Sequence, residues 1–256
     1  GIVQMQQGRY PEALGHFESG LHSMRELRSR RGIMTALSNI GIIRNRLGDA
    51  RGALRYYEEA LPIAIDLGDR QQQAIVLNNI GIVHFMAGFL DKAWAPWRES
   101  HEIRIAIGDI AGIASCANNL AIICRRRGEY AKALELYAEA EGYARRTGGR
   151  DALADPLAGK GSVLVDLERF DEALAALEES VAILRQSKNL SGLASVLISL
   201  GPCLLARGRV AEARRTKSSS ASLAESWLSG IARSAASRSG ARLVARTWRS
   251  RVVASR

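Results

Sequence analysis

The sequence has few aromatic residues, few prolines and few cysteines, and each shortage excludes a class of protein. Only 5% of its 256 residues are aromatic and five are proline, but 47% are hydrophobic, so the chain can bury a core and is not a disordered polymer. Three cysteines cannot form the dense disulfide framework of a small secreted module. No apolar run approaches the roughly 18 residues that a membrane span needs. We therefore expect a reducing, cytoplasmic environment and no membrane span.

Basic residues are in excess only near the C-terminus. Residues 1–206 contain 24 Lys and Arg and 24 Asp and Glu, whereas residues 207–256 contain 12 basic and two acidic residues, which accounts for the whole net charge of +10. The main body therefore has no excess charge that would attract nucleic acid or an anionic membrane. A nucleic-acid partner is consistent only with the basic tail.

Motifs for catalysis and metal binding are missing as well. The four histidines are scattered, and neither H-E-x-x-H nor C-x-x-C occurs. Cys116 and Cys124 lie eight residues apart on an apolar background and Cys203 is distant from both, so these residues suit core positions better than a metal site. We expect no enzyme activity, no metal and no cofactor.

Equivalent residues return every forty positions, which indicates one structural unit that is copied and stacked. One column of small residues consists of Gly41, Gly81, Ala121, Gly161 and Gly201. A second consists of Ala13, Ala53, Ala93, Ala133, Ala173 and Ala213. An aromatic column, Phe17, Tyr57, Trp97 and Tyr137, changes to Leu177 and then to Lys217. The pattern therefore weakens toward the C-terminus. We expect the small columns to let paired helices approach closely, and the aromatic to fill the space toward the next unit.

Within a unit, apolar residues have helical rather than alternating spacing. The first such set is Leu37, Ile40 and Leu47, and the second is Leu54, Tyr57 and Leu61. The spacing predicts two helices per unit, over about 31–48 and 50–68, each ending at a glycine. A propeller of similar repeat length would need four strands per copy, and the composition offers none.

The pattern L-x2-I-G-x3 followed by G-x4-A-x3-Y-x2-A resembles the tetratricopeptide repeat in a forty-residue form, similar to repeats of kinesin light chains and bacterial signalling regulators. The resemblance implies an all-α fold, an α-α superhelical solenoid of stacked helix hairpins. It covers residues 1–215, as one truncated and about five full copies with the last degenerate. The opening residues read as the second half of a unit, so we expect a piece of a longer protein.

Residues 216–256 form a basic tail rich in Ser, Arg and Ala, for which three interpretations compete. It is a poorly ordered extension that follows a capping helix, a sequence produced by a shifted reading frame, or a helix that binds nucleic acid or anionic lipid. The apolar residues of the capping helix would be Leu223, Trp227 and Ile231. The basic residues of the binding helix would be Arg242, Arg246, Arg249 and Arg251.

Asparagine recurs at one place in the first helix of three copies, although it is a mediocre helix former. At 100° per residue, Asn39 points about 160° away from the stripe that packs on the partner helix. Isoleucine or arginine follows it on the same outward face. The eight residues that we name the asparagine stripe are Asn39, Asn79, Asn119, Ile42, Ile82, Ile122, Arg46 and Arg126.

The resemblance would place the asparagine stripe on the concave wall of a superhelix. A carboxamide can accept from and donate to the backbone of an extended peptide whatever its side chains, and isoleucine adds apolar contact. Alternatively, the amides bond to the next repeat and fix helix spacing, and the arginines are merely solvated. Asp155 and Asp166 stand on the same face of the fourth copy and would reverse its polarity there.

Three functions remain open at this point. The first is a non-catalytic scaffold that binds a peptide or protein segment in its groove. The second is the regulatory or sensor arm of a larger signalling protein, such as a STAND-type ATPase, a transcriptional regulator or a nucleotide cyclase. The third is a structural role in which the tail fills the groove.

Overall fold

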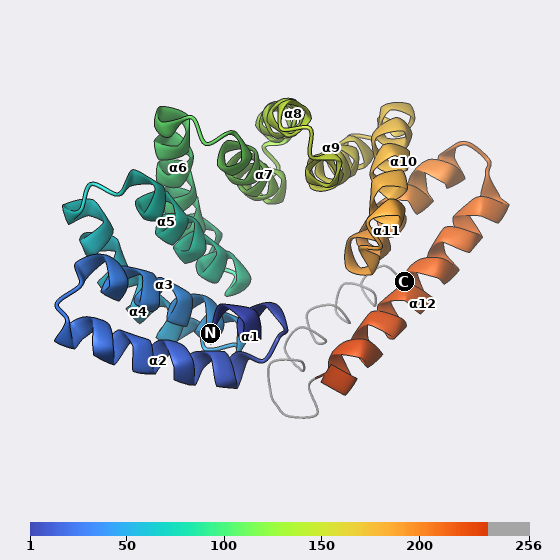
Figure 1. Cartoon of the computed structure of the whole chain (residues 1–256). Helices are drawn as coiled ribbons and strands as arrows, with labels where there is room; N and C mark the ends of the chain where they lie inside the picture. The colour runs from blue at the N-terminus through green and yellow to red at the C-terminus, as the bar shows by residue number, and fades with distance from the viewer. Residues whose placement is uncertain (235–256) are drawn as a thin grey trace. The chain divides into compact units, whose positions relative to one another are not determined.

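The computed structural model describes the backbone of residues 1–234 and the side chains of residues 1–222 except Gln6. These residues form twelve α-helices and one short 3-10 helix, with no strand among them (Figure 1). In chain order the elements are α1 (Ile2–Gln6), α2 (Tyr10–Glu26), α3 (Arg30–Arg46), α4 (Ala50–Asp66), α5 (Arg70–Met86), α6 (Leu90–Ile107), α7 (Ile110–Arg126), α8 (Tyr130–Arg146), η1 (Arg150–Leu153), α9 (Ala154–Asp166), α10 (Phe170–Gln186), α11 (Leu190–Ala206) and α12 (Val210–Ser234).

The helices pack as consecutive hairpins, each made of a first helix and a second helix. The pairs α3–α4, α5–α6, α7–α8, α9–α10 and α11–α12, which we count as copies one to five, contact each other most extensively, and the truncated copy α1–α2 precedes them. Contacts divide the chain into two compact units, one over Gly1–Gly108 and one that begins at Asp109. The all-helical hairpin fold and its forty-residue period are therefore confirmed.

Each hairpin turn depends on a left-handed residue at its end and often on a carboxylate at the next helix start. Gly48 and Gly68 have φ of 84° and 63°, which glycine adopts without a Cβ clash. Asp49 then accepts a hydrogen bond from the backbone N–H of Gly52 at 2.8 Å and caps α4. In the fourth copy Glu168 takes the same conformation with φ of 58°, so the turn survives without glycine.

The glycines of the small column make room for the large residue of their own hairpin. A Cβ on Gly41 would lie 2.5 Å from the Tyr57 ring, and one on Gly81 would overlap the Trp97 indole. Tyr57 and Trp97 therefore fill space inside their own hairpins, and Tyr57 also shares a core cluster with Val76 and Val83 of the next hairpin. Tyr137 differs because its own copy has Ala121 instead of glycine, and its ring lies against Gly159 of the following hairpin.

The alanine column lies at the closest approach of the paired helices. Ala53, Ala93, Ala133 and Ala173 are completely buried. Seven residues further along the second helix another small residue is buried, and where it is serine it bonds across the hairpin. The Ser100 hydroxyl donates to the Ala74 carbonyl and the Ser180 hydroxyl to the Ala154 carbonyl, both at 2.8 Å. These bonds fix the register of the second helix on the first.

The C-terminal helix continues into the expected tail. Helix α12 runs to Ser234, so the first part of residues 216–256 is helical. The side chains proposed for a capping helix, Leu223, Trp227 and Ile231, lie outside the described residues, as do the basic residues from Arg242 to Arg251. Among the residues described, no helix has both the length and the apolar character needed to cross a membrane.

Candidate functional site

The first helices of each unit lie on the inner side of its curve. Helix α3 contacts α5, and α9 contacts both α7 and α11, whereas no comparable contact joins second helices within the described part of the chain. Helices that touch on one side and separate on the other form a stack that bends toward the touching side. A residue on the free face of a first helix therefore faces the concave side of its own unit.

The asparagine stripe lies on this free face. Its asparagines and isoleucines are all partly exposed, while the residues beside them in the helix, such as Leu37 and Ile40, are buried. Arg46 on α3 and Arg126 on α7 are exposed. The equivalent position of α5 holds Met86, which is 62% exposed. Helices α3, α5 and α7 thus each present an amide, an aliphatic side chain and a long terminal side chain in a row.

The amides of Asn39 and Asn79 make no hydrogen bond within the part of the chain that the structure describes. The structural interpretation of the column requires these side chains to bridge successive first helices, and they do not. The bridge between α3 and α5 comes instead from Asn45, whose amide nitrogen lies 4.0 Å from the Met86 sulfur. Both stripe amides keep their donors and acceptor for a ligand.

The two arginines near the end of α3 have different roles. Arg44 is partly buried and donates to Glu18 of α2 at 3.0 Å, with Asp49 at 3.5 Å on its other side. Burial alone would lower the pKa of Arg44, but the hydrogen bond and charge of Glu18 raise it above its ordinary value. Arg46 has no such partner among the described residues. Of these two arginines, only Arg46 has its charge available on the stripe.

The fourth copy changes polarity at one of the two positions where the sequence predicts it. Asp166 is paired with Arg125 of α7, at 2.7 Å and 3.2 Å, so its charge is already compensated. Asp155 reaches solvent, yet burial by surrounding protein raises the pKa of its carboxyl above the usual value. The predicted acidic site thus reduces to Asp155.

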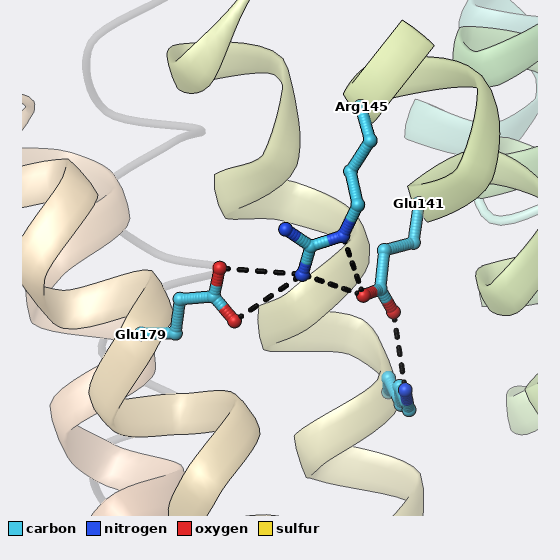
Figure 2. Close-up of polar contacts among 4 residues, drawn as sticks. Glu141, Arg145 and Glu179 are labelled. Carbon is cyan, nitrogen blue, oxygen red and sulfur yellow. Dashed lines mark hydrogen bonds and ion pairs between the residues drawn. The ribbon is translucent and has the colours of Figure 1, made fainter.

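Four charged residues that the sequence does not single out form an ionic network across three helices. Figure 2 shows Arg145 of α8 between Glu141 and Glu179. Its guanidinium donates to Glu141 at 2.8 Å and to Glu179 of α10 at 3.3 Å, while Lys160 of α9 donates to the other oxygen of Glu141 at 3.1 Å. The network ties the second helices α8 and α10 together over the first helix α9.

This network makes the stability of the protein pH-dependent. Burial alone would raise the pKa of Glu141, but hydrogen bonds from Arg145 and Lys160 outweigh it and bring the pKa below the ordinary 4.5. A folded-state pKa below the unfolded one gives stabilisation that is present above pH 4.5 and lost as the pH falls through the lower value.

We therefore expect acidification to reduce the free energy of unfolding less in Glu141→Gln than in the unmodified chain. Urea unfolding followed by circular dichroism at pH values above and below this range measures it. Glu135→Gln, which removes an exposed carboxylate from the same helix, is the matched control and should keep the original pH profile. Parallel profiles for the unmodified chain and Glu141→Gln would contradict the role of the network.

The cysteines take the positions that the sequence predicts. Cys116, Cys124 and Cys203 are buried and unbridged. Burial raises the pKa of the Cys124 thiol and, likewise, that of Cys203, which disfavours the reactive thiolate. Within residues whose side chains are described, no group of His, Cys, Asp and Glu has the arrangement of a metal site.

Comparison with known families finds one recurring description. A family model described as tetratricopeptide repeat matches residues 1–66 and 72–146, and a second one with the same description matches residues 194–216. A model described as anaphase-promoting complex subunit 5 matches residues 119–204. A search of the curated proteins finds no match.

Several solved structures are similar in fold at low sequence identity. BtubC from P. vanneervenii is 20% identical with a TM-score of 0.72, over 85% of this chain and 92% of that one. A STAND protein with a tetratricopeptide repeat sensor from Pyrococcus horikoshii is 15% identical with a TM-score of 0.73, over 92% of this chain and 35% of that one. A Rap protein complexed with competence and sporulation factor is 13% identical with a TM-score of 0.67, over 100% and 74%.

Proposed function

The chain belongs to the tetratricopeptide-repeat family, and we propose that it is a non-catalytic scaffold that binds a peptide or protein segment along the asparagine stripe. The observation that carries the proposal is the pair of partly exposed, unbonded amides of Asn39 and Asn79 on the inner side of one unit. Proteins of this family generally bind other proteins. The structurally similar Rap protein is itself complexed with competence and sporulation factor.

The chemistry of the stripe favours an extended segment. Each free carboxamide can accept a backbone N–H and donate to a backbone C=O, which any peptide sequence offers. Side-chain preference then comes from the neighbours. On α3 the neighbour is the unpaired Arg46, which suits an acidic side chain, and on α5 Ile82 and the exposed Met86 suit an apolar one. The preferred ligand carries both.

We expect Asn79→Ala to weaken peptide binding by about 1–3 kcal/mol, the cost of leaving a desolvated backbone group unpaired. Peptides are first selected from a display library on the unmodified chain, and affinities are then measured by calorimetry. Because the amide makes no bond in the fold, helix content and the urea midpoint should not change.

Arg46→Ala and Arg55→Ala form a matched pair for the same experiment. Both remove an exposed arginine, but Arg46 lies on a first helix and Arg55 on the second helix α4. Only Arg46→Ala should reduce the affinity for acidic peptides. If Asn79→Ala lowers stability and leaves affinity unchanged, the asparagine column is structural and the proposal fails.

A second candidate is the sensor arm of a larger signalling protein. It is favoured by the similarity to the STAND protein, of which this chain spans only 35%. The coding sequence on either side of this chain tests it. A nucleotide-binding or cyclase domain in the same reading frame would support the sensor role, and stop signals on both sides would exclude it.

A further inference from the structure

The outer crevices between successive second helices follow the same forty-residue register as the rest of the fold. Each has a floor made by a first helix and walls made by the second helices before and after it. In unit one Leu21 of α2 and Ile40 of α3 are both buried where these two helices meet α4. Its mouth is closed by a pair between Arg25 and Glu59 at 3.1 Å.

The crevice of α8, α9 and α10 is closed by an equivalent Arg–Glu pair, three forty-residue periods later in the chain. Arg145 and Glu179 occupy the positions of Arg25 and Glu59, and their groups meet at 3.3 Å (Figure 2). In this crevice Lys160 of α9 also forms an ion pair with Glu141 of α8, at 3.1 Å. The Arg–Glu clasp therefore closes one outer crevice in each unit, whereas the copies between them have Ile65 and Ile105 in the arginine position.

The next crevice, between α10, α11 and α12, has lost the clasp. Arg185 is in place, but the residue opposite it is Ser219 where the earlier copies have glutamate. The charged floor residues are replaced too, by Val181 and Leu200. A cavity of about 470 Å³ is found here. Its apolar lining consists of Val181, Ala182, Leu197, Leu200 and Leu204.

The rim of this cavity carries three arginines and two glutamates, which leaves one positive charge in excess. Arg209 is held by Glu212 at 2.7 Å and by Glu178 at 3.4 Å. Arg185 on one wall and Arg215 on the other are exposed and have no ion pair among the described residues. The cavity thus combines an apolar floor with an exposed arginine that has no ion pair, Arg185, opposite the place where the earlier copies have glutamate.

We propose that this outer crevice is a second docking site, which takes a segment of a partner protein with an apolar side chain beside an acidic one. The apolar side chain fills the space above Leu200, and its carboxylate neighbour occupies the place that Glu179 takes one repeat earlier, against Arg185. The volume is sufficient for several side chains. The site opens between the second helices α10 and α12, on the opposite side of the hairpins from the free face of the first helices, and is independent of the asparagine stripe.

The test uses a labelled amphipathic peptide with leucine and glutamate on one face and the full chain, followed by fluorescence anisotropy. Two further peptides replace glutamate by lysine or leucine by alanine. We expect saturable binding of the Leu/Glu peptide and at least about tenfold weaker binding of the other two, because each loses one half of the recognition. Absence of saturable binding, or equal binding of the Leu/Lys peptide, overturns the proposal.

Ser219→Glu is the most specific variant because it rebuilds the clasp with Arg185 and closes the crevice. It should reduce the affinity of the Leu/Glu peptide about tenfold, while Ser218→Glu, which adds the same charge one residue away, should not. Arg185→Gln should reduce it about fivefold without closing the crevice. Asn79→Ala should have no effect, which separates this site from the proposed groove. Unchanged affinity in Ser219→Glu overturns the proposal.

The remaining occupants are distinguished in the same assay. Tighter peptide binding after removal of residues 235–256 would identify the chain's own tail as the occupant, against the proposal. Concentration-dependent self-association that Ser219→Glu abolishes would identify a second copy of the chain, again against it.

Discussion

Trp97→Ala should cost about 3–5 kcal/mol of stability, the largest loss expected for any single truncation in this fold. The indole is 2% exposed, its nitrogen donates to the Asn78 carbonyl at 3.0 Å, and its ring lies 5.4 Å from that of Phe85. Truncation leaves a cavity between α5 and α6 and removes this hydrogen bond. The ring also lies against Gly81, which has no side chain that could move into the cavity.

The measurement is urea unfolding of the full chain, monitored by circular dichroism. Trp94→Ala is the matched control, since Trp94 stands one turn earlier on α6 and is partly exposed. It should cost less than half as much. Equal losses in the two variants would show that Trp97 does not hold the hairpin together. Because repeat proteins unfold in segments, unfolding curves should be fitted with a stepwise scheme when they broaden.

Gly81→Leu should destabilise the same hairpin by about 3 kcal/mol for the opposite reason, because it adds volume where Trp97→Ala removes it. A Cβ at Gly81 would lie 2.8 Å from the Trp97 Cγ, closer than real Cβ contacts, so α5 and α6 must separate. Gly142→Leu is the control, because Gly142 is exposed on α8 and a Cβ there meets nothing within 4 Å. It should be neutral or stabilising by up to about 1 kcal/mol.

A double variant tests the reason for the loss. Gly81→Ala combined with Trp97→Tyr copies the third hairpin, which has Ala121 with Tyr137 and folds in the same way. It should be more stable than Gly81→Ala alone. If the double variant is no better, overpacking against the indole is not the cause of the destabilisation, and the loss comes from the backbone of α5.

The hairpins were predictable because glycine and alanine recur where the geometry leaves no choice. Gly48 and Gly68 stand at left-handed turns, and Ala53 stands where two helices touch, so a column of such residues fixes the topology. The direction of the asparagine stripe was predictable for a similar reason, since the angle between residues of one helix is constant. Whether Asn39 and Asn79 bind a ligand remains a prediction.

The ionic network and the outer cavity were not predictable from one helix at a time. The reach of Lys160 to Glu141 depends on how α9 sits beside α8, which a helical wheel does not contain. The signal that was present is the change from glutamate to Ser219 in a column that is otherwise Glu59, Glu99, Glu139 and Glu179. A column of surface charges gains meaning only when its partners on the neighbouring helix are known.

The last hairpin lacks the large apolar residue that occupies the aromatic column in the earlier ones, and this has a consequence for the order in which the hairpins unfold. Lys217 stands in the aromatic column, and the nearest side-chain atom to a Cβ on Gly201 is the Thr216 hydroxyl at 3.8 Å. Because each hairpin is supported only by its neighbours, opening begins at the weakest end and advances one copy at a time. Amide hydrogens of α11 and α12 should exchange with deuterium first, followed by α9 and α10.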